Sequence, residues 1–393
     1  MQHKNLFGIL FEVKLKLSIL FALFLSACAG RNGYLQKLDC GTDYLWDNRP
    51  TESLACFDAA EPPKDYEQIM QKTYMGVGYL SLGDQSARQM FLRAYNIQAE
   101  SVQANSAEIS RLTEEFNDSA RKISGFPNLD DIVSSVNAEL DRDATVQAMR
   151  DFVNPYATWL AAVYDGVANN DLANSENFLK RVQTFAPDNQ FVKTDFNAIK
   201  SKKDSVWVVF ENGSVGQLYA KALAPAILRM WNINITVPEV AKGQKAAPFI
   251  TANGVRTSFL ADMDAIVKTD LIKYRAQNII SSVVFETVKV AATVGTVIGA
   301  HQLARNSRQN AGLFAVGGFL VANAIMSQRM SWDLSSWDKL PTEVQVARIE
   351  MPSDRIVRIS RIGEVRIPDG VRNAVIFVRL SDEYKSFVIG KLN

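Results

Sequence analysis

Histidine and cysteine are scarce in this chain, and their scarcity excludes several kinds of active site. The 393 residues include two histidines and three cysteines. An ordinary zinc site needs several His or Cys ligands, and a Ser or Cys triad needs a histidine beside its nucleophile. His3 precedes the folded region, and His301 stands at the polar end of an apolar helix, where capping or exposure is the common role of a histidine. We expect no metal, no cofactor and no enzymatic activity.

An excess of charge of either sign is also absent. Lysine and arginine number 43 against 42 aspartates and glutamates, so the formal net charge is +1. A nucleic-acid-binding protein usually carries its basic excess on one face. The most basic stretch, residues 355–366, alternates with apolar residues as strands do. The sequence therefore predicts no nucleic-acid partner.

The N-terminus carries a recognisable export signal. A basic segment precedes the apolar run 17–25, which ends in Leu25-Ser26-Ala27-Cys28. This pattern is typical of a bacterial lipoprotein signal peptide (1–27), and the run is too short to span a bilayer. We expect cleavage before Cys28 and the attachment of lipid, including palmitate, to that residue. An aspartate directly after the lipidated cysteine resembles a signal for retention in the inner membrane, and this chain has Ala29 at that position. We therefore expect an outer-membrane anchor facing the periplasm. The alternatives are an uncleaved anchor and an ordinary secretory signal.

The other two cysteines lie close together in an oxidising compartment. Cys40 and Cys56 enclose a loop of about 15 residues, which the loop-entropy model makes worth roughly 3 kcal/mol if they form a disulfide. The alternatives are free thiols or a bridge between chains. Turn-forming residues are frequent around them, so residues 28–65 are interpreted as a tether with a disulfide loop.

Residues 66–203 have the periodicity of an α-helical domain. Ala87, Phe91 and Ala94 share one helical face after a turn at Gly83. Small residues around one phenylalanine at this spacing are typical of the tetratricopeptide repeat, and a weaker copy follows at 156–187. An ordinary helical hairpin explains these residues equally well.

Residues 204–342 read as a mixed α/β region. Strands are expected at 207–210 and 233–237, helices over 218–230 and from Leu260 onward, and a tight hairpin turn at Asn253-Gly254. Asp262 and Asp264 are two residues apart and point to different sides of a helix. Capping or solvation explains them better than acid-base chemistry.

An apolar helical hairpin is expected over residues 281–330. Gly295 and Gly299 have the spacing that lets two helices pack closely, in membranes and in water alike. A buried hairpin is one interpretation of this segment, and a membrane-inserting or oligomer-forming hairpin is the other. Residues 343–393 alternate as short strands separated by turn signals and are interpreted as a small antiparallel β-module. The fold class is therefore α+β and multidomain.

Several of these motifs together resemble a known family. The chain resembles a family of uncharacterised bacterial outer-membrane lipoproteins with a tetratricopeptide-like helical region and a C-terminal β-module. The residues that carry this resemblance are Cys28, the turn Leu82-Gly83-Asp84 with Ala87, Phe91 and Ala94, the stretch from Pro248-Phe249 to Asp264, and the stretch 337–348. Members look like neighbours of lipoproteins that activate penicillin-binding proteins, so the resemblance implies an envelope role and supplies no catalytic residue.

These observations lead to two functional hypotheses. The first is a lipid-anchored scaffold that binds envelope proteins in an assembly or maintenance machine, because stacked helix pairs present extended binding surfaces. The second is a membrane-active or oligomer-forming protein that uses the hairpin at 281–330. An acid-based hydrolase would need paired carboxylates around a cleft, and the sequence shows no motif of that kind.

Overall fold

The computed structural model describes residues 33–103, 110–111, 113–117, 127–140, 154–223, 227, 235–273, 278–283 and 334–392. Over these residues the chain has the expected α+β composition. The helices are α2 (Gly33–Trp46), α3 (Pro50–Asp58), α4 (Asp65–Leu82), α5 (Ser86–Gln103), α7 (Leu129–Leu140), α8 (Pro155–Val167), α9 (Leu172–Phe185), α10 (Gln190–Lys200) and α12 (Met263–Lys273). The strands are β1 (Ser205–Asn212), β2 (Leu218–Leu223), β3 (Ile235–Val240), β4 (Thr251–Ala252), β5 (Val255–Arg256), β6 (Ser258–Asp262), β7 (Glu343–Glu350), β8 (Ile356–Ile359), β9 (Gly363–Arg366), β10 (Asn373–Leu380) and β11 (Lys385–Leu392).

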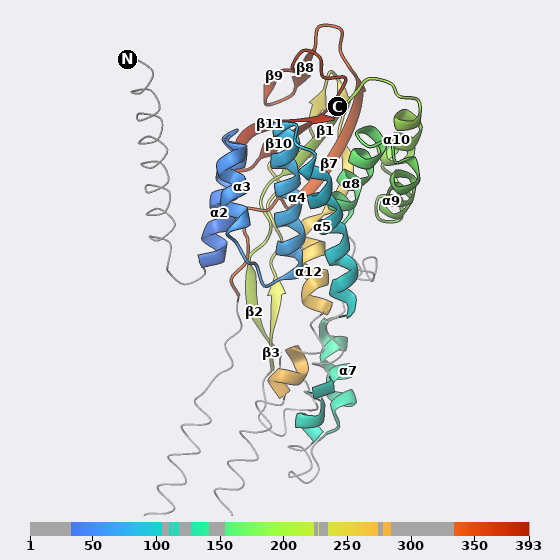
Figure 1. Cartoon of the computed structure of the whole chain (residues 1–393). Helices are drawn as coiled ribbons and strands as arrows, with labels where there is room; N and C mark the ends of the chain where they lie inside the picture. The colour runs from blue at the N-terminus through green and yellow to red at the C-terminus, as the bar shows by residue number, and fades with distance from the viewer. Residues whose placement is uncertain are drawn as a thin grey trace, which may run out of the picture.

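A five-stranded sheet organises the fold. Its strand order is β11-β10-β1-β7-β6, with β1 parallel to β10 and the other neighbours antiparallel. Every residue of the central strand β1 is buried, and its sequence is rich in valine and aromatic residues, as suits a strand covered on both faces. Helices α4 and α5 lie in front of the sheet in Figure 1, with α8, α9 and α10 beside them.

The C-terminal strands do not form a separate module. β7 and β10 flank β1 on its two sides, and β11 continues the sheet beyond β10. The expectation of a self-contained antiparallel module over 343–393 is therefore wrong, and the pairing of β1 with β10 is parallel. Strand alternation reveals which residues face a core but not which distant strand will pair with them.

The segment interpreted as a tether is helical. It forms α2 and α3, and the turn signals mark the connections between the helices rather than an irregular chain. Asn48 adopts a positive φ of 59° between the helices, and Pro50 occupies the start of α3, where its missing N–H costs nothing. Trp46 and Phe57 are buried in the main core, so this part is an integral layer of the fold.

Two further expectations for the middle region need correction. Residues 218–223 form β2 rather than a helix, because they pair with β3 along six positions. The helix expected from Leu260 begins at Met263, after the edge strand β6. The hairpin turn at Asn253-Gly254 joins β4 to β5 as expected, with φ values of 47° and 82°.

A second, smaller core lies at one end of the molecule. We call this part the arm; it comprises the β2–β3 hairpin, α7 and the described residues 113–117 and 278–283. Its buried residues form a cluster separate from the main core, namely Phe116, Leu129, Ile132, Val136, Leu223, Ile235, Val237, Ile279, Ile280 and Val283. Figure 1 shows β2 and β3 extending downward from the sheet, with α7 beside their ends.

Candidate interaction groove

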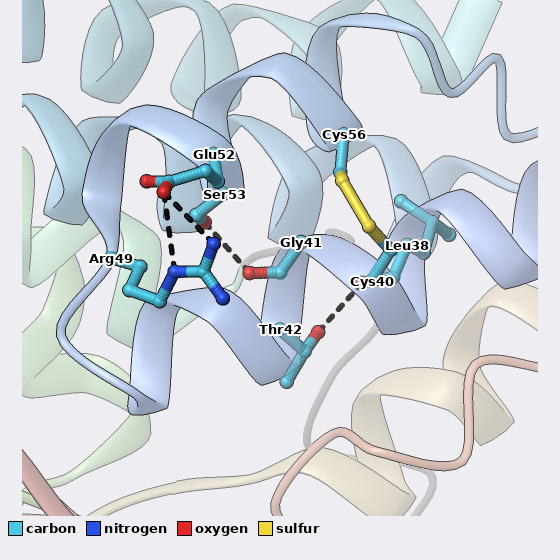
Figure 2. Close-up of a disulfide and its surroundings, with 8 residues drawn as sticks. All are labelled: Leu38, Cys40, Gly41, Thr42, Arg49, Glu52, Ser53 and Cys56. Atoms are coloured by element: carbon cyan, nitrogen blue, oxygen red, sulfur yellow. Dashed lines mark hydrogen bonds and ion pairs between the residues drawn. A yellow bond between two sulfur atoms is a disulfide. The ribbon is translucent and has the colours of Figure 1, made fainter. Parts of the chain in front are cut away.

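The cysteines expected to pair do form a disulfide. Cys40 on α2 and Cys56 on α3 are bonded, with Cα atoms 5.9 Å apart, as Figure 2 shows. The two helices touch closely because Gly41 lies under the ring of Phe57, where a Cβ atom would come within 2.6 Å of it. The Ser53 hydroxyl donates to the Gly41 carbonyl at 2.7 Å. The bridge therefore staples two helices that already pack tightly.

The predicted repeat residues lie at the contact between α4 and α5. Gly83 ends α4 in the left-handed conformation, with φ 76°. Ala87, Phe91 and Ala94 are buried, and the Phe91 ring occupies the space over Gly76, where a Cβ atom would approach it to 2.4 Å. A second pair, α8 and α9, contacts α5, and α10 follows α9. The pairs α4–α5 and α8–α9 therefore lie next to each other, with α10 beside α9.

Three residues singled out in the sequence lie outside the described residues, namely Cys28, Gly295 and Gly299, and so does His301. The structure does describe the residues that flank these segments. The Tyr34 and Ser335 hydroxyl oxygens are 3.3 Å apart. The start of α2 and the chain just before β7 are therefore side by side.

Glu211 is a carboxylate in the centre of the sheet. It accepts hydrogen bonds from the Tyr74 hydroxyl at 2.7 Å and the Tyr156 hydroxyl at 2.8 Å. All three side chains are fully buried, and burial raises the pKa of Glu211 above its usual range, against the opposing charge of Arg379. This group ties α4 and α8 to β1 and is closed to a substrate.

Asp195 joins α10 to the sheet in the same way. It accepts from the indole nitrogens of Trp159 at 2.9 Å and Trp207 at 3.1 Å, and Arg348 completes the set. Burial raises the pKa of Asp195, and the Arg348 charge opposes that shift. Glu211 and Asp195 are therefore both held by several structural partners.

Asp262 and Asp264 have separate structural roles. Asp262 accepts from the Ala265 N–H at 3.0 Å and so caps the start of α12, as expected. Asp264 accepts from the Gly216 N–H at 2.9 Å and the Gly243 N–H at 2.7 Å. Since these glycines lie at the base of the β2–β3 hairpin, Asp264 clamps the root of the arm.

An open pocket of about 510 Å³ lies along the edge strand β6, and we call it the β6 groove. The edge strand itself supplies Ser258 and Phe259, and Phe259 is 42% exposed. The other lining residues come from α10, from the β3–β4 connection, from β5 and the residue after it, and from β7: Gln190, Lys245, Pro248, Arg256, Thr257, Glu343 and Gln345.

A polar chain forms the floor of the β6 groove. The Thr257 hydroxyl donates to the Gln345 side-chain oxygen at 2.6 Å, and the Gln345 amide donates to Glu343 at 2.6 Å. Lys245 forms an ion pair with the other oxygen of Glu343. Glu343 is nearly buried and fully engaged, so it holds Lys245 in place.

Arg256 forms one wall of the groove. Its guanidinium lies over the Phe249 ring, 3.8 Å from the centroid. Such stacking is favourable and fixes the plane of the guanidinium. Among the described residues, no carboxylate forms an ion pair with Arg256. A positioned, uncompensated cation therefore faces an open pocket.

The β6 groove combines a cation, an exposed aromatic ring and a polar floor. Within the described ranges, no group of three or more His, Cys, Asp or Glu side chains could hold a metal ion. The groove contains one carboxylate, which is paired with a lysine, so it lacks the two separated acids that glycan hydrolysis requires. None of the helices that the structure describes is both long and apolar enough to cross a bilayer.

Sequence reasoning did not identify the groove. The sequence indicated Pro248-Phe249 only as a packing motif, and it gave no reason to select Lys245 or Arg256 as binding residues. These residues are brought together by the pairing of β6 with β7, whose strands lie more than 80 positions apart in the chain. Comparisons with protein-family models, curated proteins and solved structures found no match to this chain.

Proposed function

We propose that this chain is an outer-membrane-anchored periplasmic lipoprotein that acts as a protein–protein interaction scaffold in an envelope assembly or maintenance machine. The observation that carries the proposal is the β6 groove, an open pocket with a positioned cation and an exposed aromatic ring. Exposed aromatic and arginine side chains are the residues that most often anchor protein interfaces.

The N-terminal part supports the proposed anchor. Only residues 29–32 separate Cys28 from α2, and the disulfide fixes α2 to α3. A lipid on Cys28 would therefore hold the folded body close to the bilayer, because no long linker separates the two. The successive pairs α4–α5 and α8–α9 fit a tetratricopeptide-like arrangement, which we include in the proposal.

Fractionation and crosslinking of the lipidated protein in cells test this function. We expect the wild-type chain in the outer membrane and the Cys28→Ala form as an uncleaved or mislocalised precursor. Mild crosslinking, pulldown and mass spectrometry should recover one coherent set of envelope proteins that is lost with Cys28→Ala. An identical set from both forms, or no envelope protein from either, contradicts an anchored scaffold.

A second candidate function follows from the contact between Tyr34 and Ser335. Val283 in the arm and Leu334, which adjoins that contact, are the described residues that flank the segment 284–333 in the sequence. The chain that follows this apolar segment therefore lies beside the start of α2, which comes a few residues after the proposed lipid anchor in the sequence. We include membrane insertion or oligomer formation as the alternative function.

Vesicle flotation distinguishes this alternative from the scaffold. The unlipidated chain should float with outer-membrane lipid vesicles if the segment inserts, and Gly295→Leu with Gly299→Leu should weaken any detergent-resistant oligomer. A chain that stays at the bottom of the gradient and remains monomeric contradicts the alternative.

A further inference from the structure

The β6 groove offers a cation whose position is set before any ligand arrives. Arg256 is exposed, and its stacking on the half-buried Phe249 restricts the guanidinium to one plane. A planar guanidinium can form two parallel hydrogen bonds with a carboxylate, and preorganisation reduces the entropy lost when they form. Arg256 is therefore suited to receive a carboxylate from outside the chain.

The charge around Arg256 favours an anion. The one acid in the groove, Glu343, is already paired with Lys245 and hydrogen-bonded by Gln345. The charges of Lys245 and Glu343 cancel, so the net charge of the residues that line the groove is the positive charge of Arg256. An incoming carboxylate would meet a net positive wall and no unpaired acid.

An apolar contact lies beside the cation. Phe259 exposes 42% of its surface on the edge strand, and Pro248 lines the same pocket. A ligand with an acidic group next to an apolar one matches this pair of features. Proteins supply such a ligand wherever an acidic and an apolar side chain are neighbours.

Recognition by side chains fits the groove better than strand addition does. The amide of Asn189 donates to the Phe259 carbonyl at 2.6 Å and to the Ser258 carbonyl at 3.3 Å. These backbone acceptors of the edge strand are therefore occupied.

We propose that the β6 groove binds an acidic segment of a partner protein, with an aspartate or glutamate carboxylate on Arg256 and an adjacent apolar side chain against Phe259. This inference rests on the proposed scaffold function and names the chemistry of its partner. The carboxylate replaces water on the guanidinium, and the apolar side chain covers the exposed ring.

A matched pair of peptides tests the proposal on the purified mature lipoprotein in detergent. One probe is a short, capped, fluorescent peptide of alternating glutamate and valine, and the other has glutamine in place of glutamate. We expect the acidic peptide to bind about tenfold more tightly, since one charge-assisted contact is worth that much. The preference should shrink as salt is raised.

Variants locate the contact. Arg256→Gln should abolish the preference for glutamate, and Phe259→Ser should weaken both peptides. Arg366→Gln is the control, because Arg366 is an exposed arginine on β9, at the opposite edge of the sheet β5-β4-β8-β9. All three positions are exposed, so the variants are expected to fold.

Equal binding of the two peptides, no binding of either, or an equal loss in Arg256→Gln and Arg366→Gln overturns the acidic-segment proposal. None of these outcomes tests the proposed scaffold function, which is tested separately by crosslinking in cells. Conversely, a glutamate preference that depends on Arg256 supports the groove chemistry even if the crosslinks are not lost with Cys28→Ala.

Discussion

Glu211 on β1 and Arg379 on β10 lie side by side in the parallel register of the central sheet, with Oε2 and Nη1 3.5 Å apart. Both side chains are fully buried, and Arg379 also donates to the Lys339 carbonyl at 2.7 Å. The pair joins the segment before β7 and two strands that are distant in sequence. Its charges balance each other in the interior.

Breaking this pair from one side should destabilise the fold strongly. Arg379→Met leaves the Glu211 carboxylate buried without its counter-charge, and we expect a loss of about 3 to 5 kcal/mol. Adding Glu211→Gln removes that charge and should recover part of the loss, because the amide oxygen can accept from one of the hydroxyls of Tyr74 and Tyr156 while the amide NH2 donates to the other. Urea unfolding of both single variants and the double variant measures this coupling; strictly additive losses would show that the two groups are energetically independent.

The effects of substituting Phe91 and Gly76 on stability should depend on each other, because the Phe91 ring occupies the space over Gly76. Phe91→Ala should cost about 3 to 5 kcal/mol, the usual penalty for emptying such a site. Gly76→Ala should destabilise the wild-type protein, because its methyl group enters the ring, yet cost much less when Phe91 is already alanine. A double-mutant cycle by urea unfolding gives the coupling, and an equal cost of Gly76→Ala in both backgrounds refutes the packing account.

The disulfide between Cys40 and Cys56 should be complete in the exported protein. Neither thiol should react with a maleimide until reductant is added, and lipidated Cys28 has no free thiol to confuse the reading. The paired Cys40→Ser and Cys56→Ser variant should lose roughly 3 kcal/mol of stability. Labelling of the folded, untreated protein would mean that the bridge does not form.

Asp39 on α2 should make stability depend on pH near neutrality. Burial raises its pKa from 3.8 to about 7, with Asp338, Asp43 and Glu383 adding to the shift and Lys339 opposing it. Between about pH 4 and pH 7 the folded state holds a proton that the unfolded state has lost. Asp39 therefore adds to the free energy of unfolding at low pH, and this contribution is lost as the pH rises through the folded-state pKa of about 7.

Melting temperatures between pH 5 and pH 8 test this linkage. The wild-type protein should melt higher at pH 5 to 6 than at pH 8, and Asp39→Asn should flatten that part of the curve. Asp188→Asn, which alters an exposed carboxylate in the turn between α9 and α10, is the control. An unchanged slope in Asp39→Asn would assign the pH dependence to other buried acids such as Asp195 and Glu211.

Local pattern identified the helices and strands whose signals are periodic. Ala87, Phe91 and Ala94 indicated the packed face of α5, and the apolar run 207–210 indicated a strand. The pairing of Cys40 with Cys56 followed from the compartment and from the shortage of other cysteines. In each case the partners lie within a short stretch of chain.

The features that sequence reasoning missed depend on long-range contacts. The turn-forming residues around Cys40 and Cys56 predict a tether, although the first turn of a helix accepts proline, and α3 begins at Pro50. Leu218 to Leu223 contains good helix formers, but pairing with β3 decides its conformation. The salt bridge between Lys245 and Glu343 spans 98 positions, so no local pattern could have revealed the β6 groove.

Site-specific photocrosslinking in cells tests the central claim, an anchored scaffold whose partner occupies the β6 groove. A photoreactive residue replaces Phe259 in the groove, and in the control it replaces Lys385, an exposed residue of β11 at the opposite edge of the same sheet. The account predicts a crosslink from position 259 to one envelope protein, lost with Arg256→Gln and with Cys28→Ala, and no such product from position 385. The same products from both positions, or none from position 259, would contradict it.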